Sequence, residues 1–197
     1  MKATQEQGGQ AAGTGALAVP DALDAGWTVP GILRESVRRH GSRPSLEVVG
    51  GVSETYDQTW ENVSHLARCL YRQGVRPQQR VLIMLANTHL AVHGWLAVNL
   101  LNAVDVSINT GYKGQSLEHA ANLSAAQILM TTSDHLPVIL RSQPRLACLR
   151  TIILMDDADA GDRRAGAPLN ILRFRDLEAA PADCLNGPPA MPWDIGS

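Results

Sequence analysis

The chain has 197 residues and a formal net charge of −2, with 45% hydrophobic and 18% charged residues. A weakly acidic chain exerts no general attraction on nucleic acid or on an anionic membrane surface, so the composition argues against both kinds of partner. The length fits one globular domain, and an aromatic content of only 4% predicts an aliphatic core.

The cysteines and the N-terminus carry information about the compartment. Cys69, Cys148 and Cys184 are odd in number, lie far apart and form no C-x-x-C pair. This usage is typical of reduced thiols, so we expect a cytoplasmic protein without a disulfide framework. The N-terminus shows no charged start followed by an apolar stretch, so no signal peptide is predicted. No apolar run reaches the roughly 18 residues of a membrane span.

The first predicted element follows a polar tail. Residues 1–26 are rich in Gly, Ala and Gln and carry few large apolar side chains, so we expect them to be disordered. Thr28 is then placed as the N-cap of a helix that has Pro30 in its first turn. Gly41 is the stop signal of this helix.

A hairpin and a second helix come next. Two β-prone runs, 46–49 and 52–56, flank a Gly-Gly pair, which predicts a β-hairpin. The following helix is expected to be capped by Thr59 and to end at Gly74. Its apolar residues recur at helical spacing, so this face must pack on a sheet. They are Trp60, Val63, Leu66, Ala67, Leu70 and Tyr71.

Residues 80–114 form the centre of the predicted fold. A short apolar strand at 81–85 is followed by a polar break, an apolar helix at 90–103 and a second apolar strand at 104–108. A polar turn at 109–114 ends the segment. Apolar runs without alternation indicate elements that are covered on both faces. The segment is therefore predicted to be a β–α–β unit at the centre of an α/β layer.

Strands and helices continue to alternate after this unit. Strands are predicted at 127–131 and 151–155, an edge strand at 169–172, and short helices at 116–126, after Ser133 or Asp134, and at 176–180. The alternation favours a parallel sheet with right-handed crossovers. The predicted fold class is α/β, with a partly parallel sheet flanked by helices and preceded by an N-terminal β-hairpin.

The residues contain no complete motif for catalysis or phosphate binding. In the segment 111–116, Lys113 is followed by glycine, which is not the order of a nucleoside-triphosphate loop. No G-x-G-x-x-G follows a strand and no G-x-S-x-G elbow is present. The favoured interpretation of 111–116 is an exposed turn that closes a strand and opens a helix.

Two groups of residues resemble metal ligands but are not predicted to bind metal. His89 and His93 have the i, i+4 spacing that can hold zinc, yet no Glu or Cys joins them locally, so packed, hydrogen-bonded histidines are favoured. Asp156, Asp157 and Asp159 follow a strand, where carboxylates can hold magnesium. Arginines nearby dilute their charge, and a solvated loop is favoured.

A set of short motifs resembles one enzyme family. The runs V-L-I-M-L-A-N at 81–87, L-N-A-V at 101–104 and S-I-N-T-G-Y-K-G at 107–114 are similar to the acyl-adenylate-forming superfamily. That superfamily comprises acyl-CoA synthetases, luciferases and the adenylation domains of peptide synthetases. The runs R-P-S-L at 43–46 and T-Y-D-Q-T-W-E-N-V at 55–63 resemble further motifs of the family in the same order. The resemblance covers about residues 27–195, and the Y-K-G turn is closest to the acyl- or carnitine-CoA ligase type.

This chain departs from the family pattern at two structural positions. Asn102 stands where glycine is usual, and Ser107 stands where proline is usual. Both departures bear on local packing more than on function.

The resemblance implies a two-step reaction for a larger parent enzyme. A carboxylate attacks the α-phosphate of ATP to give an acyl-adenylate and pyrophosphate, and the thiol of CoA then displaces AMP, with Mg²⁺ offsetting the phosphate charge. The resemblance also implies that the phosphate loop, the ribose-binding aspartate and the catalytic lysine lie outside this span. The run P-W-D-I at 192–195 resembles the lead-in to that loop.

We therefore expect residues 27–197 to be the incomplete first subdomain of the large N-terminal domain. The span alone is expected to be inactive, with no catalytic or metal-binding residue and no bound cofactor. Its partners would be the remainder of the ligase chain and, in the parent, a small carboxylic acid. Lys113 is the only basic residue on the turn after the I-N strand, and we consider it a possible contact to the CoA phosphates, against the alternative of a solvated lysine.

Two other interpretations remain open at this stage. One is a stand-alone, non-catalytic interaction module that complements a separately encoded catalytic chain. The other is a small flavodoxin-like domain that binds a nucleotide by itself. Within the ligase interpretation, CoA and a carrier protein are alternative acceptor thiols.

Overall fold

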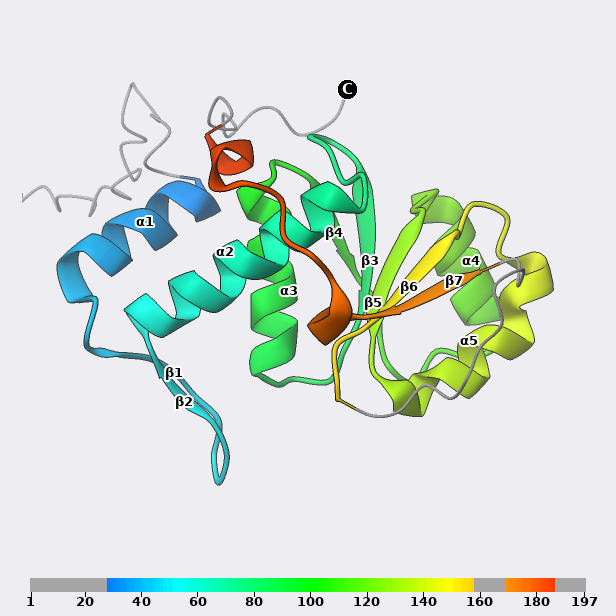
Figure 1. Cartoon of the computed structure of the whole chain (residues 1–197). Coiled ribbons are helices and arrows are strands. Elements are labelled where there is room, and N and C mark those ends of the chain that lie inside the picture. The colour runs from blue at the N-terminus through cyan, green and yellow to red at the C-terminus, as the bar shows by residue number, and fades with distance from the viewer. Residues whose placement is uncertain (1–27, 158–168, 187–197) are drawn as a thin grey trace, which may run out of the picture.

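A computed structural model describes residues 28–157 and 169–186, and the tail predicted at 1–26 lies outside them. A five-stranded parallel sheet lies between two helical layers, and a two-stranded antiparallel hairpin projects from one end (Figure 1). The predicted α/β class is confirmed.

The helices are α1 (Val29–His40), α2 (Tyr56–Arg72), α3 (His89–Leu100), α4 (Gln115–Ser124) and α5 (Leu136–Ser142). The strands are β1 (Pro44–Glu47), β2 (Ser53–Thr55), β3 (Arg80–Met84), β4 (Val104–Ser107), β5 (Ile128–Thr131), β6 (Thr151–Leu154) and β7 (Asn170–Arg173).

The strand order of the large sheet is β4-β3-β5-β6-β7, and all its neighbouring pairs are parallel. The chain leaves β3 toward β4 on one side and then crosses to β5 on the other side. The carboxyl ends of β3 and β5 therefore form a topological switch point. β7 lies at an edge, as predicted. β4 lies at the other edge, with Val104 38% exposed, so the prediction that both central strands are covered on both faces is wrong for β4.

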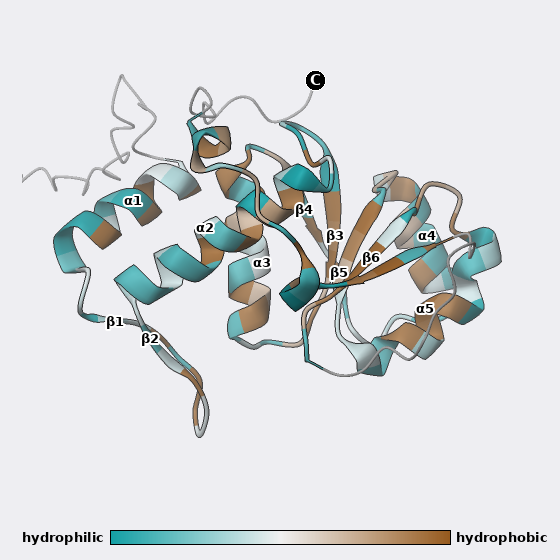
Figure 2. Cartoon of the chain, viewed as in Figure 1, coloured by the Kyte–Doolittle hydropathy of each residue, from teal (hydrophilic) through white to brown (hydrophobic). Residues whose placement is uncertain are grey.

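Alternate residues of the central strands pack into two separate apolar clusters. Val81 and Ile83 of β3 belong to the cluster under α2 and α3, whereas Leu82 and Met84 belong to the cluster under α4 and α5. Figure 2 shows brown, hydrophobic strands at the centre, whereas α1 and α2 carry much teal, hydrophilic sequence. Both faces of β3, β5 and β6 are therefore buried, which explains why the sequences of these strands are apolar without alternation.

The helix boundaries follow local capping chemistry. The Thr28 hydroxyl accepts the backbone N–H of Gly31 at 3.2 Å, and Gly41 is the C-cap, so both predicted limits of α1 are confirmed. The prediction that Thr59 caps the second helix is wrong. Thr55 is its N-cap and forms a capping box with Gln58, so the helix starts one turn earlier.

The helix predicted at 176–180 is absent. A 3₁₀ turn at Phe174–Asp176 leads into an extended segment and a second 3₁₀ turn at Ala182–Leu185. Pro181 disfavours the helical conformation in the residue before it, which explains the error. We call residues 177–185 the strap, because they run back along α2 toward α1 (Figure 1). Ala180 and Arg68 of α2 exchange two hydrogen bonds, of 2.6 and 3.2 Å.

Within residues 28–157 and 169–186, no helix has both the length and the apolar character that crossing a bilayer requires.

Candidate functional site

The switch point is the natural first candidate for a site, because open parallel sheets bind ligands outside the carboxyl ends of their strands at such points. Two hydrogen-bond systems organise this edge. The Thr131 hydroxyl donates to the carbonyl oxygen of Met84 at 3.0 Å and ties the ends of β5 and β3 together. The Asp156 carboxylate, after β6, accepts the backbone N–H of Ser133 at 3.1 Å and its hydroxyl at 2.6 Å. These hydrogen bonds hold the chain segments at the carboxyl edge of the sheet in place.

A groove of about 640 Å³ lies between the hairpin and the start of α3, next to the end of β3. Its walls are mostly apolar, with Trp95 of α3 41% exposed and Val49 of the hairpin fully exposed. Asn87 and Thr88, which follow β3 in the chain, also line the groove. This composition suits an apolar group better than a phosphate.

The turn between β4 and α4 lies on the same edge of the sheet and carries Lys113. The side chain of Asn109 accepts the backbone N–H of Gly111 at 2.7 Å, and Gly114 has φ 50° and ψ −128°. The latter conformation suits glycine because it has no side chain. The turn predicted at 111–116 is confirmed. The Lys113 side chain is exposed and makes no hydrogen bond or ion pair with the residues that the structure describes, so it is available to an incoming anion.

The structure places His93 in a buried polar cluster that joins the hairpin to the helices. Its Nε2 lies 2.8 Å from Glu54 Oε2, and both side chains are less than a tenth exposed. Glu54 also accepts the Thr59 hydroxyl at 3.2 Å and the Asn62 side-chain amide at 3.1 Å. His89 contacts His93 edge to face, with ring centroids 5.6 Å apart. The predicted packed, hydrogen-bonded histidine is thus confirmed for His93.

Sequence reasoning missed the role of Glu54. The only local signal is a carboxylate at an inward-facing position of a short strand, and nothing near it in the chain indicates its partner. Among residues 28–157 and 169–186, no group of three or more His, Cys, Asp or Glu could hold a metal ion. The hydrogen bonds of Glu54 link β2 of the hairpin to α2 and α3.

The acidic run after β6 does not converge on one point. Asp156 is engaged by Ser133, whereas Asp157 is exposed and lies 3.7 Å from Arg175. Asp159 lies outside the described residues. All three cysteines are free thiols. Burial raises the pKa of Cys69 to about 11, so this thiol is a poor nucleophile at neutral pH.

The sheet, its switch point and the turn at its edge define a doubly wound α/β domain. Residues 33–184 match the family described as AMP-binding enzyme, and the chain belongs to that family.

Relatives include both peptide synthetases and CoA ligases. The chain is 34% identical over 104 residues to phosphinothricin tripeptide synthetase PhsC of Streptomyces viridochromogenes, which covers 53% of this chain and 10% of the relative. It is 26% identical over 104 residues to 4-coumarate–CoA ligase 2 of Nicotiana tabacum, covering 51% and 19%. The match thus spans a fifth or less of the length of these relatives.

Solved structures share the fold. An anthranilate CoA ligase in complex with anthranoyl-AMP superposes with a TM-score of 0.66 at 20% identity, covering 83% of this chain and 28% of that one. A long-chain-fatty-acid-CoA ligase from Archaeoglobus fulgidus superposes with a TM-score of 0.61 at 19% identity, covering 68% and 28%. The described α/β unit thus shares its fold with a part of these CoA ligases.

Proposed function

We propose that this chain is the N-terminal portion of a cytoplasmic, ATP-dependent acyl-CoA synthetase. The enzyme would activate a carboxylic acid as an acyl-adenylate and transfer the acyl group to CoA. The observation that carries the proposal is the family match over residues 33–184, which coincides with the folded part of the chain. Adenylation serves the chemistry because a free carboxylate is a poor electrophile, whereas AMP is a good leaving group.

The described residues supply little of this chemistry themselves. Lys113, exposed at the carboxyl edge, is the residue that we assign to the CoA phosphates. Mg²⁺, when bound, would offset the charge on the ATP phosphates. Asp156 and Asp157 are not suited to bind Mg²⁺, because Asp156 accepts a hydrogen bond from Ser133 and Asp157 lies next to Arg175. We therefore assign ATP, Mg²⁺ and the carboxylic acid to the remainder of the ligase chain, and we propose that residues 27–197 alone are inactive.

A carrier protein is the second candidate for the acceptor thiol. The 34% identity to a peptide synthetase supports it, because this value exceeds the 26% identity to the CoA ligase. The two acceptors are distinguished by supplying the parent enzyme with CoA or with a phosphopantetheinyl carrier domain and measuring AMP release for each.

Pyrophosphate exchange tests the proposed activity. The parent enzyme is expected to incorporate labelled pyrophosphate into ATP only when its own carboxylic acid is present, which a panel of acids would identify. The 197-residue chain alone is expected to give no exchange with any acid. Exchange by the isolated chain would contradict the assignment of catalysis to other parts of the enzyme.

Replacing Lys113 by alanine tests its proposed role. An exposed ionic contact contributes about 0.5 kcal/mol, so the variant parent enzyme should show about a twofold higher KM for CoA. Pyrophosphate exchange, which precedes CoA binding, should not change. Arg141→Ala, at an exposed position of α5, is the matched control. An unchanged KM for CoA in the Lys113 variant would leave Lys113 as a solvated turn residue.

A further inference from the structure

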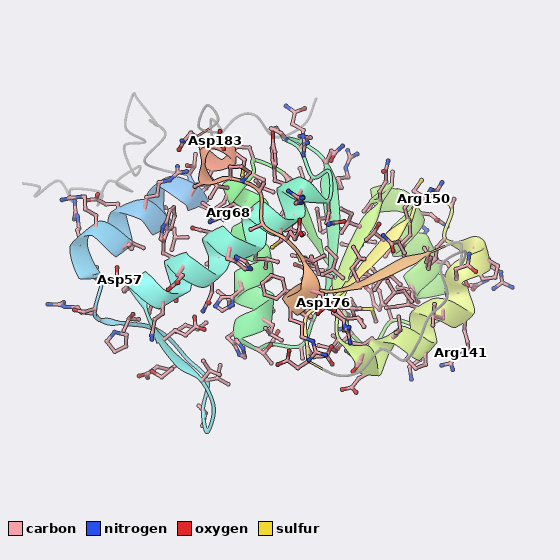
Figure 3. All side chains as sticks on the ribbon, viewed as in Figure 1. Asp57, Arg68, Arg141, Arg150, Asp176 and Asp183 are labelled. Carbon is pink, nitrogen blue, oxygen red and sulfur yellow. The ribbon has the colours of Figure 1, made fainter. Side chains whose placement is uncertain are left out.

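The amino-terminal edge of the parallel sheet carries a row of polar side chains. Strand pairing aligns Val81, Ile128 and Thr151. The residues immediately before them are Arg80, Gln127 and Arg150, so these three stand at the same level on neighbouring chain segments. Because neighbouring strands lie about 4.8 Å apart, the two arginine Cα atoms are about 10 Å apart, with the glutamine between them. Figure 3 labels Arg150 at the start of β6.

The same three residues line a cavity of about 340 Å³. Gln73, at the end of α2, and two glutamines of the following loop, Gln78 and Gln79, also line it. None of the lining residues is acidic. The cavity therefore combines two positive charges with several amide groups and has no carboxylate to neutralise them.

Both guanidinium groups keep hydrogen-bond donors that are not used by the described residues. Nη1 of Arg150 donates to the carbonyl oxygens of Ala147 and Leu149 at 2.9 and 3.0 Å, which fixes the side chain and leaves Nε and Nη2. The exposed side chain of Arg80 makes no hydrogen bond or ion pair within residues 28–157 and 169–186. One arginine is thus held in position, and the other can move onto a ligand.

The helix ends nearby do not cancel this charge. α2 and α4 both end beside the cavity, and a helix C-terminus carries about −0.5 of an elementary charge. Two such ends offset about half of the formal charge of +2. The last carbonyls of α2 are also capped, since Val75 and Gly74 donate to Leu70 and Tyr71 at 3.0 Å. The net field in the cavity remains positive and favours an anion.

The rim of the cavity is held in place by the backbone. Gln78 has φ 65°, a conformation in which a residue other than glycine is uncommon. Its N–H donates to the carbonyl oxygen of Asn102 at 2.8 Å, and the side chain of Gln79 accepts the N–H of Arg76 at 3.0 Å. A rim fixed in this way loses little conformational entropy when a ligand binds.

We propose that this cavity binds a phosphate group, carried either by inorganic phosphate or by a small phosphate ester. Planar guanidinium groups match phosphate oxygens in pairs, and the row offers donors from two sides with an amide between them. A tetrahedral phosphate presents acceptors toward both arginines at once, whereas a carboxylate presents two oxygens in one plane.

Calorimetry on the 197-residue chain tests the proposal, with sodium phosphate or glycerol 3-phosphate as titrant at fixed ionic strength and pH 7.5. Saturable binding is expected, and the tighter of the two probes identifies the source of the phosphate group. Arg80→Gln, which removes a side chain that is not hydrogen-bonded within residues 28–157 and 169–186, should weaken binding at least fivefold. Arg80→Gln combined with Arg150→Gln should abolish it. Arg141→Gln, an exposed arginine of α5 outside the cavity, should change the affinity less than twofold.

Backbone amide shifts provide the second measurement. The amides of Gln127 and Thr151 should move on titration with the tighter-binding probe, while those of α5 stay in place. The proposal is overturned if neither probe binds saturably, if Arg141→Gln weakens binding as much as Arg80→Gln, or if the shifts are spread evenly over the surface.

Discussion

Replacing Glu54 by alanine should test whether the buried cluster holds the hairpin to the helices. The carboxylate accepts hydrogen bonds from His93, Thr59 and Asn62 at 2.8 to 3.2 Å. Asn62 is exposed and can turn to water, and Thr59 keeps its contact with Ser45 at 2.6 Å. His93 is buried and loses its carboxylate partner.

The magnitude follows from these contacts. A hydrogen bond to a charged group contributes about 1.5 to 3 kcal/mol, and the bond from His93 is the one that water cannot replace. Adding the partial loss at Thr59 gives a decrease of about 3 kcal/mol in the free energy of unfolding.

Urea denaturation followed by far-ultraviolet circular dichroism measures this free energy. His93→Ala should also destabilise the protein, and the double variant should cost at least 1 kcal/mol less than the sum of the two single variants. Glu61→Ala, at an exposed position of α2, is the control and should stay within about 0.5 kcal/mol of the unmodified protein. A loss below 1 kcal/mol for Glu54→Ala, with an unchanged slope m, would refute the reasoning.

Three further predictions concern other parts of the molecule. Burial hides Cys69 and raises its pKa to about 11, so a disulfide reagent at pH 8 should modify Cys69 more slowly than the half-buried Cys148. Equal modification rates of the two cysteines, measured by mass spectrometry, would contradict this. Hydrogen bonds from Arg38 and its neighbour lower the pKa of Glu35 to about 2. The ionised Glu35 should therefore contribute its full stabilisation of the folded state above about pH 4.5, and this contribution should disappear as the pH falls toward 2. An NMR titration that gives Glu35 an ordinary carboxyl pKa would contradict this prediction. A Cβ at Gly94 would lie 3.1 Å from the Met130 methyl group, so Gly94→Val should overpack α3 against the sheet. The free energy of unfolding should decrease by about 1 to 3 kcal/mol, and thermal unfolding would show this as a lower Tm.

Local chemistry made much of the fold predictable. Thr28 and Gly41 set the limits of α1 because a cap requires only residues next to it in sequence. The error at Thr59 falls within the same local chemistry. The T-x-x-Q pattern from Thr55 to Gln58 is a capping box, which places the start of the helix one turn before Thr59.

Features that depend on distant residues were not predictable in this way. Glu54 and His93 are 39 positions apart, and neither neighbourhood indicates the other. The edge position of β4 depends on the order of the strands, which the hydrophobicity of one strand does not encode. Lys113 was placed correctly on an exposed turn, because glycines and a polar run mark such turns locally.

The strap has a consequence for how the protein is made. It is hydrogen-bonded to the first two helices over long distances in sequence. Arg68 of α2 donates to Ala180, which is 112 positions away, and Arg34 of α1 donates to Leu185, which is 151 positions away. Translation delivers the N-terminal helices first, so they leave the ribosome long before this packing partner exists. Until then their outer surfaces stay uncovered, and a nascent chain stalled before residue 177 should be the species that chaperones retain.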